Sequence, residues 1–178
     1  MVLERDVGPR PGEAYFIGPL RFDAKPGDDY VLILTSPLEF VDTKGEHVTA
    51  PAGMQTDGAS VGRLLRIPLL GLLTRHVLAG DQFTGPFRWP AVNHDGEYAR
   101  AEESEFWPAL RSPERAAADR RIFEGARCRW IQIRSNGLFV ARTPAPWWRA
   151  AIVHFLLRAF GWLAWIEDSR AARSLPNL

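Results

Sequence analysis

The stretch "PAGMQTDGASVGR", residues 51–63, marks the point at which the chain changes character. Before it lie short runs of β-branched and aromatic residues that are bounded by turn residues. After it lie longer runs with helical spacing. Strands first and helices afterwards are typical of an α+β domain. We therefore predict a single α+β domain, with an N-terminal antiparallel sheet (a meander) followed by a helical C-terminal half.

The predicted strands lie in the first third of the chain. They are the runs "YFIGPLRF" (15–22), "YVLILTS" (30–36) and "LEFVD" (38–42). The segment "DTKGEHV" (42–48) predicts a hairpin turn, because Gly45 is free to take a positive φ. The return strand is then "HVTAPAGMQT" (47–56), interrupted at Pro51.

The predicted helices follow. They are a broken helical stretch over 60–80, a helix over 88–104 with Pro90 in its first turn, a helix within 112–130 and a long Trp-rich helix over 146–167. The third is the strongest, because Ser112 can act as its N-cap and Pro113 suits its first position. We divide the chain into a loose arm (1–14), a core (15–135) and a C-terminal helix with its tail (136–178).

The composition predicts a folded chain. Hydrophobic residues make up 46% of the 178 residues, which is enough for a sizeable core and excludes wholesale disorder. The single cysteine, Cys128, excludes an internal disulfide and a multi-thiolate zinc site within one chain. We expect it to be a small buried hydrophobe. The first residues carry charge and proline where a signal peptide needs an apolar run, so we predict no signal peptide and residence in a cytoplasm.

The charge is unevenly spread along the chain. Residues 1–57 hold five Lys or Arg against ten Asp or Glu, a net charge of −5, and residues 58–178 hold seventeen against eleven, a net charge of +6. Two windows, 58–80 and 125–166, contain no acidic residue. Such windows can bind phosphate or an anionic membrane surface, although we favour the interpretation that they pack against the acidic part of the same chain. No phosphate loop, dinucleotide fingerprint or nucleic-acid-binding motif accompanies them, so we expect no sequence-specific nucleic acid partner.

The segment "AVNHDGEYAR" (91–100) holds the first candidate site. On a helix, His94 and Tyr98 share a face, whereas Asp95 points about 100° away. A neutral histidine and carboxylates can bind a divalent metal, but an adjacent His and Asp cannot complete a site alone. Asp119 is a candidate further ligand, because the three alanines before it let another helix approach closely.

Asp57 and Ser60, in the opening stretch, form the second candidate cluster. Such side chains often cap a helix N-terminus, which is the structural interpretation. The functional interpretation is a carboxylate on a tight turn that faces whatever His94 faces. A Ser60–His94–Asp triad is disfavoured, because "DGASVG" lacks the Gly-x-Ser-x-Gly elbow.

These pieces together resemble a known family. The motifs "PAGMQTDGASVGR", "AVNHDGEY" and "AADRRIF" occur in the order found in a domain of unknown function that is common in phages and prophages. The resemblance covers residues 15–135 and implies a phage-related protein of the host cytoplasm or the virion. The family's marked positions correspond to Asp57, Ser60, His94, Asp95, Tyr98 and Asp119.

The chain departs from the family's pattern in ways that concern local packing more than the polar cluster. Gly62 stands where the family usually has proline. Gly96 and Glu97 stand where it usually has a large apolar pair, and the segment "LAGDQFTGPFRW" (78–89) is longer than its usual link.

Two functions of different classes follow. The first is a divalent-metal-dependent hydrolase, in which bound Zn, Mn or Mg makes a nucleophile of its water. Its metal ligands would come from His94, Asp95, Asp57 and Asp119, and Ser60 or Tyr98 would donate hydrogen bonds to the substrate. The second is a non-catalytic virion or assembly component with a purely structural polar cluster. Its partners would be other phage proteins or a host envelope component.

The segment 147–166 predicts an amphipathic helix. Its broad apolar face is expected to hold Trp148, Ile152, Phe155, Leu156, Ala159, Phe160, Leu163 and Ile166, and its narrow opposite face His154, Arg158 and Gly161. Its arginines and histidine argue against a membrane span. We expect the domain to cover the apolar face, with Trp147 and Trp165 partly exposed and Arg149 bound to an acid or a carbonyl. The alternative is a helix that lies on a membrane surface or docks on a partner.

Overall fold

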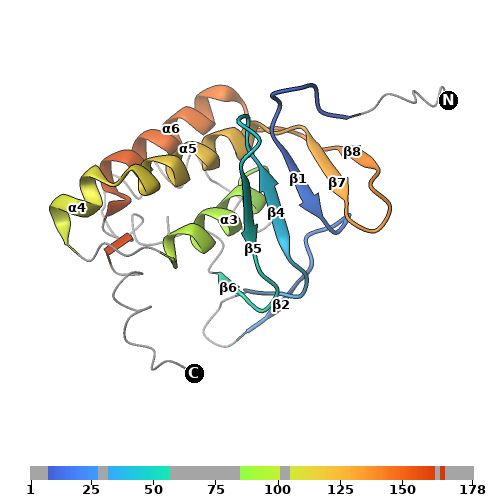
Figure 1. The fold of residues 1–178 in the computed structure, drawn as a ribbon, viewed down its shortest axis with the longest axis horizontal. Coiled ribbons are helices and arrows are strands. Elements are labelled where there is room, and N and C mark those ends of the chain that lie inside the picture. Colours follow the sequence, from blue (N-terminus) through green and yellow to red (C-terminus); the bar gives the residue numbers. More distant parts are fainter. Residues whose placement is uncertain (1–7, 28–31, 57–84, 101–104, 163–164, 167–178) are drawn as a thin grey trace.

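The strands form two sheets that meet the helices on one side (Figure 1). The structure is a computed structural model, and it describes residues 8–27, 32–56, 85–100, 105–162 and 165–166. Within these ranges the larger sheet has the order β5-β4-β1-β7-β8, and the smaller sheet has the order β2-β3-β6. The larger sheet comprises β1 Tyr15–Gly18, β4 Leu38–Val41, β5 His47–Ala50, β7 Trp130–Ile133 and β8 Phe139–Ala141. The smaller sheet comprises β2 Ala24–Pro26, β3 Leu32–Leu34 and β6 Gln55–Thr56.

The predicted hairpin joins β4 to β5. Val41 pairs with His47 across the turn, and Gly45 has a φ of 81°, as its position predicted. The side chain of Asp42 supports this turn by accepting hydrogen bonds from the backbone N–H groups of Lys44 at 2.8 Å and Glu46 at 2.9 Å. β5 ends before Pro51 and the chain resumes as β6, so the predicted interruption of the return strand is confirmed.

The larger sheet is mixed, because its last two strands come from the C-terminal half. β7 runs parallel to β1, with Tyr15 opposite Trp130, and β8 returns antiparallel to β7. A parallel pair needs a long crossover connection, and the helices between β5 and β7 supply it. The sequence did not predict these strands, and β8 lies in the segment that we expected to hold only the C-terminal helix and its tail.

The predicted α+β architecture is confirmed, with antiparallel strands first and helices after them in one body. The predicted meander was wrong, because β1 pairs with β4 while β2 and β3 belong to the smaller sheet. The helices are α3 Arg88–Tyr98, α4 Phe106–Arg111, α5 Pro113–Arg127 and α6 Trp147–Phe160. α3 packs on the larger sheet, α5 packs on α3, and α6 packs on α5 (Figure 1). The Ser112 hydroxyl accepts from the N–H of Arg115 at 3.2 Å, which confirms the predicted cap. The helical stretch predicted over 60–80 lies outside the described residues.

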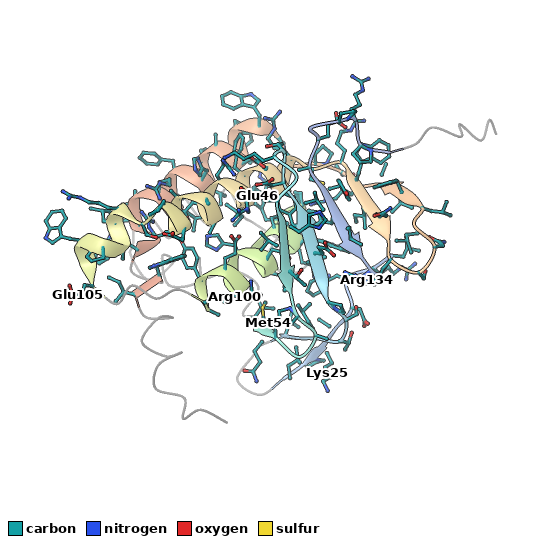
Figure 2. The ribbon with its side chains drawn as sticks, viewed as in Figure 1. Lys25, Glu46, Met54, Arg100, Glu105 and Arg134 are labelled. Atoms are coloured by element: carbon teal, nitrogen blue, oxygen red, sulfur yellow. The ribbon has the colours of Figure 1, made fainter. Side chains whose placement is uncertain are left out.

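The main core lies between α3 and the larger sheet. Phe16 and Phe40 are buried there with ring centroids 4.8 Å apart, beneath Val92 of α3. Gly96 lets α3 lie close to the side chain of Met54, which is labelled in Figure 2. A Cβ atom at position 96 would lie 3.0 Å from the Met54 sulfur. The small residue at position 96 therefore fits its local packing.

The buried face of helix α6 differs from the predicted one. Its buried residues are Ala150, Val153, Leu156 and Leu157, whereas Trp148 is 49% exposed and Phe155 is 66% exposed. The inward arc is therefore centred roughly opposite Trp148. The expectation that the domain covers most of the apolar face was wrong for Trp148 and Phe155, whereas Leu156 and Ile166 of that face are buried. Among the described residues, no helix is long and apolar enough to cross a membrane.

The predictions for the other aromatic and charged residues of this helical segment were only partly correct. Trp147 is 65% exposed, as predicted. The prediction for Trp165 was wrong, because it is buried and packs edge-on against Tyr98 with ring centroids 4.8 Å apart. The guanidinium of Arg149 lies 5.8 Å from the centre of the Phe87 ring, in a cation–π contact.

Candidate functional site

A buried carboxylate joins three helices. Asp119, in the middle of α5, is 0% exposed. Its Oδ1 accepts a hydrogen bond from the Tyr98 hydroxyl at 2.6 Å and lies 3.2 Å from Nε2 of His94. Its Oδ2 accepts from Nη1 of Arg115 at 3.2 Å and from Nη1 of Arg158 at 3.1 Å. We call these five residues the Asp119 cluster.

Helical spacing explains how the cluster forms. His94 and Tyr98 are four residues apart on α3 and face α5 together, as the sequence predicted. Their rings are 4.0 Å apart between centroids. Alanines precede Asp119 and keep this side of α5 narrow, so the two helices can approach closely.

Arg115 ties the cluster to the ends of two further helices. It is fully buried, and its Nε donates to the carbonyl of Ala109 at 2.9 Å. Its Nη1 also donates to the carbonyl of Leu157 at 3.1 Å. Its Nη2 lies 3.4 Å from the carbonyl oxygens of Leu110 and Arg158. One guanidinium thus links α4, α5 and α6.

The sequence reading missed Arg115 and Arg158. Arg115 stands four residues before Asp119 in an alanine-rich helix, and this i, i+4 spacing could have identified it. Arg158 was assigned to the narrow polar face of α6. That face turns toward Asp119 rather than toward solvent, which the sequence alone did not indicate.

The ionisation of the cluster follows from its contacts. Burial on its own would raise the pKa of Asp119, but His94, the Tyr98 hydroxyl and Arg115 outweigh it and hold this pKa below its usual value. Burial raises the pKa of Tyr98 well above its usual value, and the negative charge of Asp119 adds to the effect. Asp119 is therefore an ionised acceptor, and Tyr98 is a neutral donor.

Asp95 belongs to a different contact. The Thr56 hydroxyl donates to Oδ2 of Asp95, which ties α3 to β6. The structure therefore brings His94, Tyr98 and Asp119 together and places Asp95 on another side of α3. Asp57 and Ser60, which complete the predicted site, lie outside the described residues. In the described part of the chain, no three or more His, Cys, Asp or Glu side chains could hold a metal ion together.

A second charged network lies along the opposite side of α5. Asp42 is buried and pairs with Arg120 at 3.2 Å and with Arg121 at 3.5 Å. Arg121 also contacts Glu97 of α3 and Glu46 of the hairpin. Glu97 is thus the α3 partner of a cation on α5.

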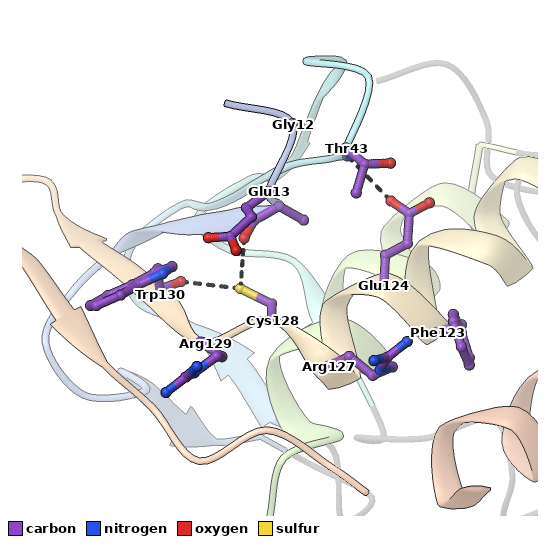
Figure 3. A pocket seen from close by; sticks show the side chains of 10 residues that line it. Gly12, Glu13, Thr43, Phe123, Glu124, Arg127, Cys128, Arg129 and Trp130 are labelled. Atoms are coloured by element: carbon purple, nitrogen blue, oxygen red, sulfur yellow. Dashed lines mark hydrogen bonds between the residues drawn. The ribbon is translucent and has the colours of Figure 1, made fainter. Parts of the chain in front are cut away.

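A cavity of about 320 Å³ lies at the C-terminal end of α5 (Figure 3). Its wall includes Cys128, whose sulfur lies 3.3 Å from the carbonyl oxygen of Ala14 and 3.2 Å from that of Trp130. Burial raises the pKa of this thiol, which disfavours a nucleophilic thiolate. Cys128 is buried, as expected, and the cavity shares no lining residue with the Asp119 cluster.

The Asp119 cluster is closed to solvent at its centre. His94 is 2% exposed, and Arg115 and Asp119 are 0% exposed. A catalytic metal site keeps a coordination position open to water or substrate, and the near-zero exposure of these side chains in the described part of the chain argues against one here. No model of a known protein family, no curated protein and no solved structure matches this chain.

Proposed function

We propose that the chain is a non-catalytic binding component whose Asp119 cluster is structural. The observation that carries this proposal is the carboxylate of Asp119, which is fully buried and has two partners at each oxygen. Its lone pairs are committed to the helices around it. A metal ligand or a general base needs at least one lone pair available to the metal or the substrate proton.

The contacts of Arg115 support the same function. Its N–H groups donate to carbonyl oxygens at the ends of α4 and α6, where a helix runs short of internal donors; the carbonyl of Leu157 also accepts from the N–H of Gly161. A buried cation that satisfies such groups and neutralises Asp119 fixes the positions of the helices. The cluster would therefore act as a scaffold, and partner binding would occur on the protein surface.

The biological setting of the proposal rests on the motif resemblance. The segments 51–63, 91–98 and 117–123 resemble a domain common in phages and prophages. A virion or assembly component, acting in the host cytoplasm or the virion, agrees with that resemblance. Other phage proteins or a host envelope component are its proposed partners, and the outward face of α6 is its proposed attachment surface.

The test compares two histidines that each contact a carboxylate. His94→Ala should lower the free energy of unfolding by about 1–3 kcal/mol, because it leaves buried polar groups without partners. His47→Ala is the matched control, since His47 pairs with Glu39 at the surface and should cost less than about 1 kcal/mol. Urea unfolding of both variants measures the difference.

Metal binding is the result that would contradict a structural role of the Asp119 cluster. Protein purified without a histidine tag should show no rise in Tm on addition of Zn, Mn or Mg. A rise that His94→Ala abolishes, with a variant that otherwise unfolds like the wild type, would overturn the structural assignment in favour of a metal-dependent hydrolase.

A further inference from the structure

Helix α6 carries its large aromatic residues on the outside. Trp148 and Phe155 are seven residues apart and therefore share one face, with Trp147 beside them; the three are 49%, 66% and 65% exposed. We call them the aromatic stripe. The opposite face, toward α5, buries Ala150, Val153 and Leu157. A surface helix of a soluble domain usually has the reverse arrangement, with its large apolar residues inward.

The stripe lies in a positively charged part of the chain. Residues 125–166 contain six arginines and no acidic residue, and of these arginines Arg134 and Arg158 pair with acids outside the window. Arg127, at the end of α5, is exposed, and Arg149, in the first turn of α6, is partly exposed. Of the acids on the middle and end of α5, Asp119 is buried and Glu124 is paired with Arg120. The charge around the stripe therefore favours an anionic partner.

We propose that α6 lies on an anionic lipid surface, with the aromatic stripe in the headgroup region and nearby arginines against lipid phosphates. This proposal rests on the proposed function, in which α6 is the attachment surface, and it names the partner of that surface. Tryptophan favours the membrane–water interface, and a helix that lies in this plane combines bulky apolar residues with basic ones. The exposed aromatic residues and the arginines of this window without acidic residues are the two features that such a surface requires together.

The size of the stripe argues against a second copy of the chain as its partner. An aromatic side chain presents about 150–250 Å². The exposed fractions of the three residues thus amount to roughly 270–450 Å². A stable protein interface buries about 800 Å² on each partner. Two copies would also bring like charges together, whereas lipid phosphates neutralise them.

Vesicle sedimentation tests the proposal with the full-length chain. The protein should sediment with phosphatidylglycerol–phosphatidylcholine vesicles, and binding should be at least about tenfold weaker on pure phosphatidylcholine. Binding should also weaken as salt is added, because salt screens the arginine–phosphate attraction. The variant Trp147→Ser/Trp148→Ser/Phe155→Ser should lose binding while its Tm stays within a few degrees of the wild type.

The matched control is Leu138→Ser, which removes an exposed apolar residue from the turn between β7 and β8 and should bind like the wild type. The single variant Trp148→Ser serves if the triple variant does not fold, and it should weaken binding severalfold. Equal binding by wild type and Trp148→Ser overturns the proposal. So does a failure of the wild type to bind anionic vesicles, or a dimer in sedimentation velocity that the stripe variants disperse. None of these results bears on the His94 test, so the two proposals can fail separately.

Discussion

Arg115 and Asp119 lie one helical turn apart on α5, and both are completely buried while their side chains form an ion pair of 3.2 Å. Most i, i+4 pairs lie on the helix surface and contribute little. This pair is enclosed by α3, α4 and α6, and groups on all three helices form hydrogen bonds or ion pairs with its side chains. Its stability therefore depends on all of them being in place.

Removing the cation should be the most damaging single change. Arg115→Ala leaves the carboxylate of Asp119 with fewer partners, takes the guanidinium donor from the carbonyl of Ala109, and leaves the carbonyl of Leu157 with the backbone N–H of Gly161. The loss of one partner of a buried pair typically costs about 3–5 kcal/mol. Urea unfolding measures it, with Arg134→Ala as the control, because Arg134 pairs with Glu39 at the exposed surface. Equal costs for the two variants would show that the buried pair is not structural.

Stability should fall on acidification, and part of that fall should belong to Asp119. Its pKa is lower in the folded chain than in the unfolded chain, so the unfolded chain binds more protons in the acidic range. The stabilisation is therefore present above the unfolded pKa and is lost as the pH falls through the lower folded pKa. The Asp42 carboxyl, whose pKa is also lowered, acts in the same direction.

The variant Asp119→Asn separates the two carboxyl groups. The difference in unfolding free energy between about pH 7 and about pH 3 should be smaller in this variant than in the wild type, although the variant is less stable at both. Asp42→Asn should produce a similar reduction. An unchanged difference in Asp119→Asn would mean that the pKa of Asp119 is not lowered by folding.

Gly161 tests how closely α6 approaches α3. A Cβ atom at this position would lie 2.7 Å from the Tyr98 hydroxyl oxygen and 2.5 Å from the carbonyl oxygen of Leu157. Gly161→Ala should therefore destabilise the fold by about 1–3 kcal/mol through overpacking. The cost should be lower in a Tyr98→Phe background, where the hydroxyl is absent, and thermal unfolding of the four proteins of this cycle measures the coupling. Additive effects would contradict the contact.

How much of this could be read from the sequence depends on how local each signal is. The Ser112 cap, the turn at Gly45 and the shared face of His94 and Tyr98 follow from residues a few positions apart, and all three were predicted. Asp119 was also identified as a site residue, because the alanines before it indicate a close contact between helices.

The misses involve partners that are distant in the chain. β7 joins β1 across more than a hundred residues, and no periodicity in Trp130–Ile133 indicates a parallel neighbour. The α6 face was assigned by size, whereas the residues that α6 buries are Ala150, Val153, Leu156 and Leu157. Once that arc is known, the burial of Gly161 and the contact of Arg158 with Asp119 follow from helical spacing.

Asp95 and Thr56 should behave as a pair that holds β6 against α3. Thr56 is 3% exposed, and its hydroxyl donates to the Asp95 carboxylate. Thr56→Val keeps the shape and removes the donor, so it should cost about 1–3 kcal/mol. In an Asp95→Ala background the same substitution should cost less, and urea unfolding of the double-mutant cycle measures the difference. An unchanged cost would show that the hydroxyl does not stabilise the fold through Asp95.

Deleting residues 146–178 should unfold the domain, even though α6 is the proposed attachment surface. The deletion removes the carbonyl groups of Leu157 and Arg158 that accept from Arg115, and with them the Arg158 guanidinium that contacts Asp119. It also uncovers Ile122 of α5, which is 4% exposed in the intact chain. A buried charge pair and an apolar surface would both meet water, so we expect an insoluble product or one without a cooperative unfolding transition. Circular dichroism with thermal unfolding measures this. A soluble truncation that unfolds cooperatively and no longer binds vesicles would instead make α6 an appendage to a core that is stable without it.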